Sequence, residues 1–109
     1  MFENINKGLE EFKSTPGAVL VDVREPDEFA SGHIPGAVNL PLSGIQNMSA
    51  SAGMQSVFEG SAVSKDTVMF IYCLRGSRRM RAAGILKKMG YRNVKSIGGI
   101  KQYQGEIEK

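Results

Sequence analysis

The stretch TVMFIYCLRGSRRMRAAGILKKMG, residues 67–90, holds the clearest strand and the clearest helix of the 109-residue chain. Residues 67–72 form a nearly continuous apolar run rich in β-branched and aromatic side chains, which is typical of a strand buried on both faces. Residues 79–89 carry apolar side chains at helical spacing, and Gly90 is expected to end that helix. The sequence therefore predicts a strand, a tight loop and a helix, with Cys73 directly after the strand.

The rest of the chain alternates short strands and short helices in the same manner. Strands are expected at residues 18–23, 37–40 and 93–97, and helices at residues 2–12, 25–32, 43–48 and 100–109. The Ser-, Ala- and Gly-rich residues 49–64 fit either a weak helix or a surface loop. Strands that alternate with helices predict a parallel α/β sheet with helices on both faces.

Length and composition predict one soluble globular domain, residues 1–109, with 41% hydrophobic and 23% charged residues. The net charge of +3 comes without a long basic run, so nucleic acid is not an expected partner. No apolar run is long enough for a membrane span, and the acidic N-terminal residues do not resemble a signal peptide. With a single cysteine, these features favour a cytoplasmic protein. One histidine and no cluster of acids or thiols predict neither a metal site nor a cofactor.

The loop after the central strand is the candidate site, because ligands of parallel sheets bind at the carboxyl ends of strands. Loop amides, the following helix N-terminus and nearby arginines would all favour a thiolate at Cys73. A lone cysteine is often only a small buried apolar residue, but here three arginines follow it within six residues. The candidate nucleophile is Cys73, and the candidate substrate-binding loop is Leu74, Arg75, Gly76, Ser77, Arg78 and Arg79.

A second group of polar residues follows the expected strand at residues 18–23. Asp22, Arg24 and Glu28 bring charges close to a buried strand end, where pairing is expected, and we predict an ion pair between Arg24 and Glu28. For His33, a structural hydrogen bond to the backbone is favoured over a role in proton transfer. These four residues are predicted to support the site.

The chain resembles the single-domain rhodanese family, the sulfurtransferases of the thiosulfate type. Two motifs carry the resemblance, VDVREPDEFASGHIPGAVNLPL at residues 21–42 and YCLRGSR at residues 72–78, and GYRNVKSIGGI at residues 90–100 is a weaker match. The resemblance implies a rhodanese-like fold with a mainly parallel, five-stranded sheet. It also implies that Cys73 takes a sulfane sulfur from a small anionic donor and, as a persulfide, passes it to cyanide, a small thiol or a protein thiol. A monomer or weak dimer is expected.

The spacing of the arginines leaves a second chemistry open. Arg78 fits the six-residue loop of the sulfurtransferases, whereas Arg79 fits the longer loop of the similar dual-specificity phosphatases. Tyr72 before the cysteine and Met80 after Arg79 depart from the phosphatase pattern, so sulfur transfer is favoured. A phosphatase or arsenate reductase, and a non-catalytic sulfur carrier or binding module, remain alternatives. We expect Arg78 to close the loop, and Arg79 to point to the rim or to solvent.

Overall fold

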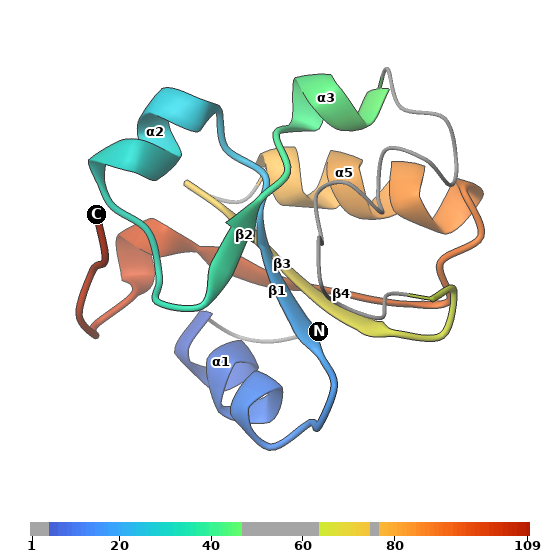
Figure 1. The fold of residues 1–109 in the computed structure, drawn as a ribbon, viewed down its shortest axis with the longest axis horizontal. Helices are drawn as coiled ribbons and strands as arrows, with labels where there is room; N and C mark the ends of the chain where they lie inside the picture. Colours follow the sequence, from blue (N-terminus) through green and yellow to red (C-terminus); the bar gives the residue numbers. More distant parts are fainter. Residues whose placement is uncertain (1–4, 47–63, 75–76) are drawn as a thin grey trace.

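The computed structural model describes residues 5–46, 64–74 and 77–109, and within them the chain forms one parallel sheet between helices (Figure 1). The strands are β1 (Val19–Asp22), β2 (Ala37–Asn39), β3 (Val68–Cys73) and β4 (Asn93–Gly99), in the order β2-β1-β3-β4. All three pairings are parallel, for example Leu20 with Phe70. The predicted parallel α/β architecture is confirmed. The described part of the sheet has four strands rather than five, and these match the four apolar runs in the sequence.

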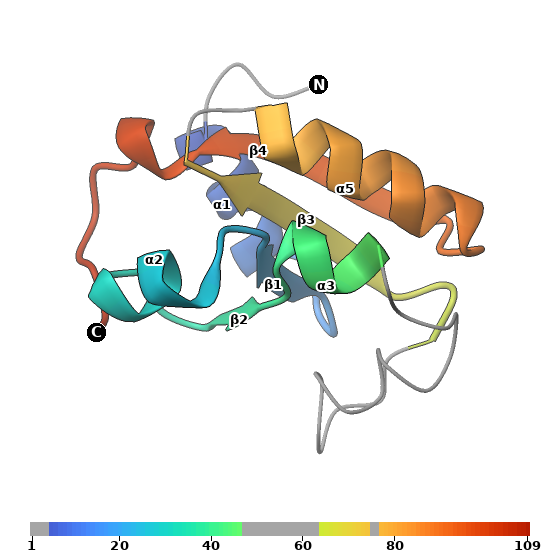
Figure 2. The ribbon, with the colours of Figure 1, turned by 90° about the horizontal axis from the view of Figure 1, so that it is seen from above.

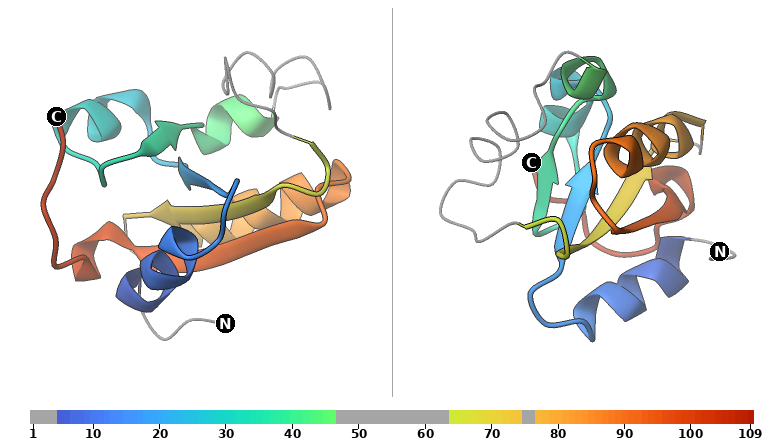
Figure 3. Two further views of the ribbon diagram at one scale, coloured as in Figure 1. Left: turned by 60° about the horizontal axis from the view of Figure 1, so that its bottom comes forward. Right: turned by 90° about the vertical axis from the view of Figure 1, so that its right-hand side faces the viewer.

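Helices cover both faces of the sheet, as Figure 3 shows from two further directions. The helix α1 (Ile5–Lys13) packs on one face, while α3 (Leu42–Gln46) and α5 (Ser77–Lys88) pack on the other. The short helix α2 (Pro26–Ser31) has no buried residue and follows the carboxyl end of β1. The helices predicted around residues 25–32 and 79–89 are therefore present, and so are the described parts, residues 5–12 and 43–46, of those predicted over residues 2–12 and 43–48. Residues 2–4 and 47–63, about which the sequence also makes predictions, lie outside the described residues.

The central strand β3 explains how the apolar run becomes a scaffold for the site. Met69 and Ile71 belong to the hydrophobic core under α3 and α5, whereas Phe70 and Tyr72 belong to the core under α1. Successive side chains of a strand alternate between faces, so a strand covered on both sides must be apolar throughout. Cys73 continues the α5 side of this alternation and ends the strand.

The predicted helix over residues 100–109 is wrong. Only one 3₁₀ turn, η1 (Ile100–Gln102), forms there, and the segment beyond it runs extended to an antiparallel bridge between Glu108 and His33. Residues 103–109 are mostly exposed and contain Gly105, so they have no apolar stripe to hold a helix against the sheet. Their backbone instead exchanges two hydrogen bonds with His33, of 2.9 and 2.8 Å.

Candidate active site

Cys73 lies where the sequence places it, at the carboxyl end of β3 and before α5. It is only 1% exposed, packs in the core beneath α5 and pairs in register with Gly99 of β4. The helix α5 begins four positions later, at Ser77. Arg75 and Gly76 of the predicted loop lie outside the described residues, and for Ser77 only the backbone is described. Leu74 follows the cysteine and is half-buried.

Arg78 and Glu28 join the loop to the upstream motif through a bidentate ion pair. Nη1 and Nη2 of Arg78 donate to Oε1 and Oε2 of Glu28 at 2.6 and 3.0 Å. The hydrogen bond with Arg78 is the main reason why the pKa of Glu28 is lowered to about 2. The pKa of Arg78 is raised, first by Glu28 and to a smaller extent by its electrostatic interaction with Cys73. The guanidinium of Arg78 therefore lies within electrostatic reach of the sulfur.

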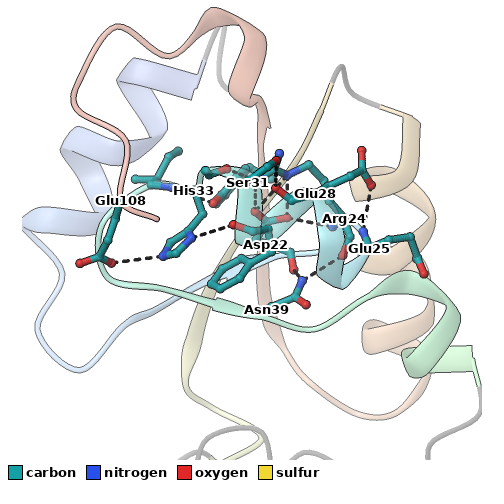
Figure 4. Close-up of polar contacts among 12 residues, drawn as sticks. Asp22, Arg24, Glu25, Glu28, Ser31, His33, Asn39 and Glu108 are labelled. Carbon is teal, nitrogen blue, oxygen red and sulfur yellow. Dashed lines mark hydrogen bonds and ion pairs between the residues drawn. The ribbon is translucent and has the colours of Figure 1, made fainter.

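Arg24 pairs with Asp22, so the predicted ion pair between Arg24 and Glu28 is wrong. Nε of Arg24 donates to both carboxylate oxygens of Asp22 at 3.1 and 3.0 Å, and Nη2 donates to Oδ2 at 2.7 Å (Figure 4). The Arg24 amide adds a 2.8 Å bond to the same carboxylate. Asp22 is fully buried and needs these donors, whereas Glu28 lies on a half-exposed side of α2 and faces the loop. Burial would lower the pKa of Arg24, but its contacts with Asp22 raise it overall.

Two further residues complete this network and were not singled out in the sequence. Nδ2 of Asn39 donates to the carbonyl oxygens of Asp22 and Arg24 at 3.0 and 2.9 Å, which ties β2 to the end of β1. The amide of Glu25 donates to Oε1 of Glu28 at 2.9 Å, as in a capping box. The three-residue spacing of Glu25 and Glu28 at the start of a helix was the available signal. For Asn39 the signal was only its place at the end of a strand.

His33 has the backbone contact expected of a structural histidine, and also a partner that the sequence did not indicate. Its Nδ1 lies 2.9 Å from the carbonyl oxygen of Phe29, and its ring stacks on the Phe29 ring at 3.7 Å. Its Nε2 lies 3.2 Å from Oε1 of Glu108, as Figure 4 shows. Because Glu108 is 75 residues away, no local pattern could have predicted the pair.

Arg79 does not point to the rim or to solvent, contrary to the prediction. It is half-buried, and its Nη1 donates to the hydroxyl of Ser96 on β4. Its Nε is buried without a hydrogen-bond partner among the residues that the structure describes. The reason is helical spacing, because Ala82 and Ala83, three and four positions later on α5, are buried against the sheet and share a helix face with position 79. Within the described ranges, Arg79 therefore contacts β4, whereas Arg78 pairs with Glu28.

A pocket of about 360 Å³ adjoins the end of β3, and the described residues that line it are Leu74, Gly99, Lys101 and Gln102. The turn η1, which carries the last two, follows the carboxyl end of β4 (Figure 2).

Among the described residues, no three histidine, cysteine or acidic side chains gather as metal ligands would. In the same part of the chain no helix is long and apolar enough to cross a bilayer.

The chain is similar to a family of known proteins over most of its length. Residues 6–106 match the rhodanese-like domain family. The uncharacterized protein YqhL of Bacillus subtilis is 36% identical over 92 residues, which are 84% of this chain and 64% of that protein. A putative mitochondrial thiosulfate sulfurtransferase of Schizosaccharomyces pombe is 37% identical over 99 residues, which are 88% of this chain and 67% of that protein. The chain thus spans about two thirds of the length of both relatives.

The solved structures show the same fold. The human single-domain sulfurtransferase TSTD1 matches with a TM-score of 0.72 and 24% identity, over 90% of this chain and 94% of that one. The family match covers both motifs, the Asp22–Arg24 network and the strand, loop and helix around Cys73. The chain belongs to the rhodanese-like domain family.

Proposed function

We propose that the protein is a sulfurtransferase that moves a sulfane sulfur from thiosulfate, or a similar small anion, through a persulfide on Cys73. The observation that carries this proposal is the position of Arg78. It is held by Glu28, lies within electrostatic reach of the sulfur and sits at the start of the helix that follows the strand. A fixed cation beside a thiol favours both a thiolate nucleophile and an anionic substrate.

In the first step the Cys73 thiolate attacks the outer sulfur of thiosulfate. A new S–S bond forms, the S–S bond of thiosulfate breaks, and its electron pair leaves with sulfite, so that Cys73 carries a persulfide. Arg78 would stabilise the negative charge that passes to the leaving group. The remaining loop residues, Leu74 to Ser77, are proposed to bind the anion.

In the second step an external nucleophile takes the outer sulfur and Cys73 returns to the thiolate. The chain has one cysteine, so it cannot resolve the persulfide with a thiol of its own. Cyanide, a small thiol or a protein thiol would serve, and a reducing compartment such as the cytoplasm would keep Cys73 available. Cyanide would leave as thiocyanate.

The direct test is turnover of thiosulfate and cyanide to thiocyanate, measured with the wild type and with Cys73→Ser. We expect turnover in the wild type and none in the variant. Met80→Ala is a suitable control, because Met80 is an exposed residue of α5 and has no part in the proposed chemistry. If the folded wild type formed no thiocyanate, the proposal would be wrong.

One observation favours a second candidate, a phosphatase that uses Arg79. That side chain is turned inward onto β4 rather than outward, and it is the arginine that a longer loop would use. Hydrolysis of an aryl phosphate by the wild type, lost in both Cys73→Ser and Arg79→Lys but kept in Arg78→Lys, would establish this candidate. If aryl phosphate hydrolysis were lost in Arg78→Lys and kept in Arg79→Lys, a phosphatase that uses Arg79 would be excluded.

A further inference from the structure

The pocket beside the loop is close to Cys73 along two strands. Leu74 directly follows Cys73 in the chain, and Gly99 is the register partner of Cys73 on β4. The amide of Lys101 donates to the carbonyl oxygen of Leu74 at 3.3 Å, which joins η1 to the residue after the cysteine. A molecule in this pocket would thus lie next to the carboxyl end of β3.

The pocket is lined by both apolar and polar residues, and this combination suits a ligand that has an apolar part and a carboxylate. Leu74 and Gly99 provide an apolar and backbone wall, while the side chains of Lys101 and Gln102 are exposed. Lys101 forms no ion pair with any residue of the described ranges, and its ammonium is the cation of the described pocket lining. The Lys101 ammonium can bind a carboxylate of a ligand, and the Gln102 amide can bind an amide of the same ligand. The apolar side of the pocket would contact a short aliphatic chain that carries both groups.

The volume of the pocket fits a peptide-like acceptor better than the small sulfur donor. The volume of about 360 Å³ lies within the range of about 300–1,000 Å³ that is common for small-molecule sites, and it far exceeds the needs of thiosulfate or cyanide. A donor that must reach only the sulfur would leave most of the pocket empty. A peptide-like thiol could place its sulfur at Cys73 and its carboxylate at Lys101.

We propose that this pocket is the acceptor site, and that Lys101 selects thiols that carry a carboxylate. The inference rests on the sulfurtransferase function proposed above. The acceptor thiolate attacks the outer sulfur of the Cys73 persulfide, the S–S bond to Cys73 breaks, and its electron pair returns to Cys73 as thiolate. The acceptor leaves as a persulfide, and no additional oxidant or reductant is needed.

The test compares three acceptors at saturating thiosulfate: glutathione, its diethyl ester and cyanide. The measured quantity is kcat/KM for each acceptor with the wild type, Lys101→Gln, Lys101→Glu and Lys101→Arg. An exposed ion pair predicts that Lys101→Gln lowers the ratio of the glutathione value to the cyanide value about fivefold. We expect a larger fall in Lys101→Glu, recovery in Lys101→Arg and no such change in the ratio of ester to cyanide. The difference should shrink at high salt.

The matched control is Lys87→Gln, which removes an exposed lysine from the last turn of α5. It should leave the ratio at the wild-type value. In a second series thiosulfate is varied at a fixed concentration of cyanide; if Lys101→Gln changes the KM for thiosulfate and not the acceptor ratio, the pocket serves the donor and the inference is overturned. An unchanged acceptor ratio in Lys101→Glu also overturns it, with the proposed function intact as long as thiocyanate forms. No thiocyanate from the wild type would overturn both.

Discussion

Two arginine–carboxylate pairs flank the candidate site, and they differ in both burial and reach. The Arg24–Asp22 pair is nearly inaccessible, with side chains 6% and 0% exposed, and joins residues two positions apart. The Arg78–Glu28 pair is 30% and 28% exposed and joins residues 50 positions apart. The first pair closes the turn after β1, whereas the second connects α2 to the helix that follows the cysteine.

We propose that similar ion pairs serve stability in one region and the sulfurtransferase reaction in the other. A buried pair cannot lose one partner without leaving an uncompensated charge in the protein interior. A half-exposed pair is screened by solvent, so its removal costs little stability. It does, however, determine where the guanidinium of Arg78 points. Variants of the two pairs should therefore separate folding from turnover.

The largest effect is expected for Asp22→Asn. The amide cannot balance the charge of buried Arg24, so the free energy of unfolding should fall by about 3–5 kcal/mol. Urea denaturation of the purified protein measures the change. Asp27→Asn, at an exposed position of α2, is the control and should stay near the wild type. A loss of under about 1 kcal/mol in Asp22→Asn would mean that the buried pair does not stabilise the fold as described.

Glu28→Gln should have the opposite effect, with a small loss of stability and a large loss of turnover. Its cost in unfolding free energy should be at most about 1 kcal/mol, since the pair is partly exposed. Its kcat/KM for thiosulfate should fall about tenfold, because an Arg78 that is no longer held by two hydrogen bonds no longer keeps its fixed place within electrostatic reach of the sulfur. Steady-state kinetics give the second number, with Glu10→Gln on α1 as control. Wild-type turnover in Glu28→Gln would show that Arg78 needs no such support.

A fall in pH should weaken the ion pair between Arg78 and Glu28. Arg78 lowers the pKa of Glu28 from 4.5 to about 2, so the pair contributes stability above pH 4.5. This contribution is lost as the pH falls from 4.5 towards 2. The difference in unfolding free energy between the wild type and Glu28→Gln should therefore be constant near neutral pH and vanish towards the acid end. Urea denaturation over that range tests it, and a difference that grows on acidification would contradict it.

Ser96→Ala should have the smallest effect. It removes the partner of Nη1 of Arg79 on β4, which should cost about 0.5–1.5 kcal/mol of unfolding free energy. If Arg78 is the arginine of the loop, most of the turnover should remain. A tenfold or larger loss of turnover in Ser96→Ala would instead place Arg79 in the chemistry, and it would weaken the contrast between the two pairs.

The sequence predicted the parts of the molecule that local patterns determine. The apolar run of β3 and the stripe of α5 need only burial to form, and both were found, together with the position of Cys73 between them. The closing helix was predicted wrongly, because residues 103–109 gain more from pairing with His33 than from helical turns without an apolar face.

The side-chain partners were harder to predict than the elements that carry them. Asp22, Arg24, Glu28 and Arg78 were all recognised as charges at the site, but which carboxylate meets which arginine depends on burial and on the packing of α2 beside the loop. The contact between Arg79 and Ser96 depends on where α5 begins. Such pairings are properties of the assembled fold, and spacing along the chain does not reveal them.

The most direct test of the central claim is the intact mass of the protein after treatment with thiosulfate and removal of excess reagent. We expect a gain of one sulfur atom that peptide mapping places on Cys73. Cyanide should reverse this gain, and Cys73→Ser should not show it. If the wild-type protein is folded and fully reduced and yet stays unmodified, Cys73 does not carry sulfur from thiosulfate.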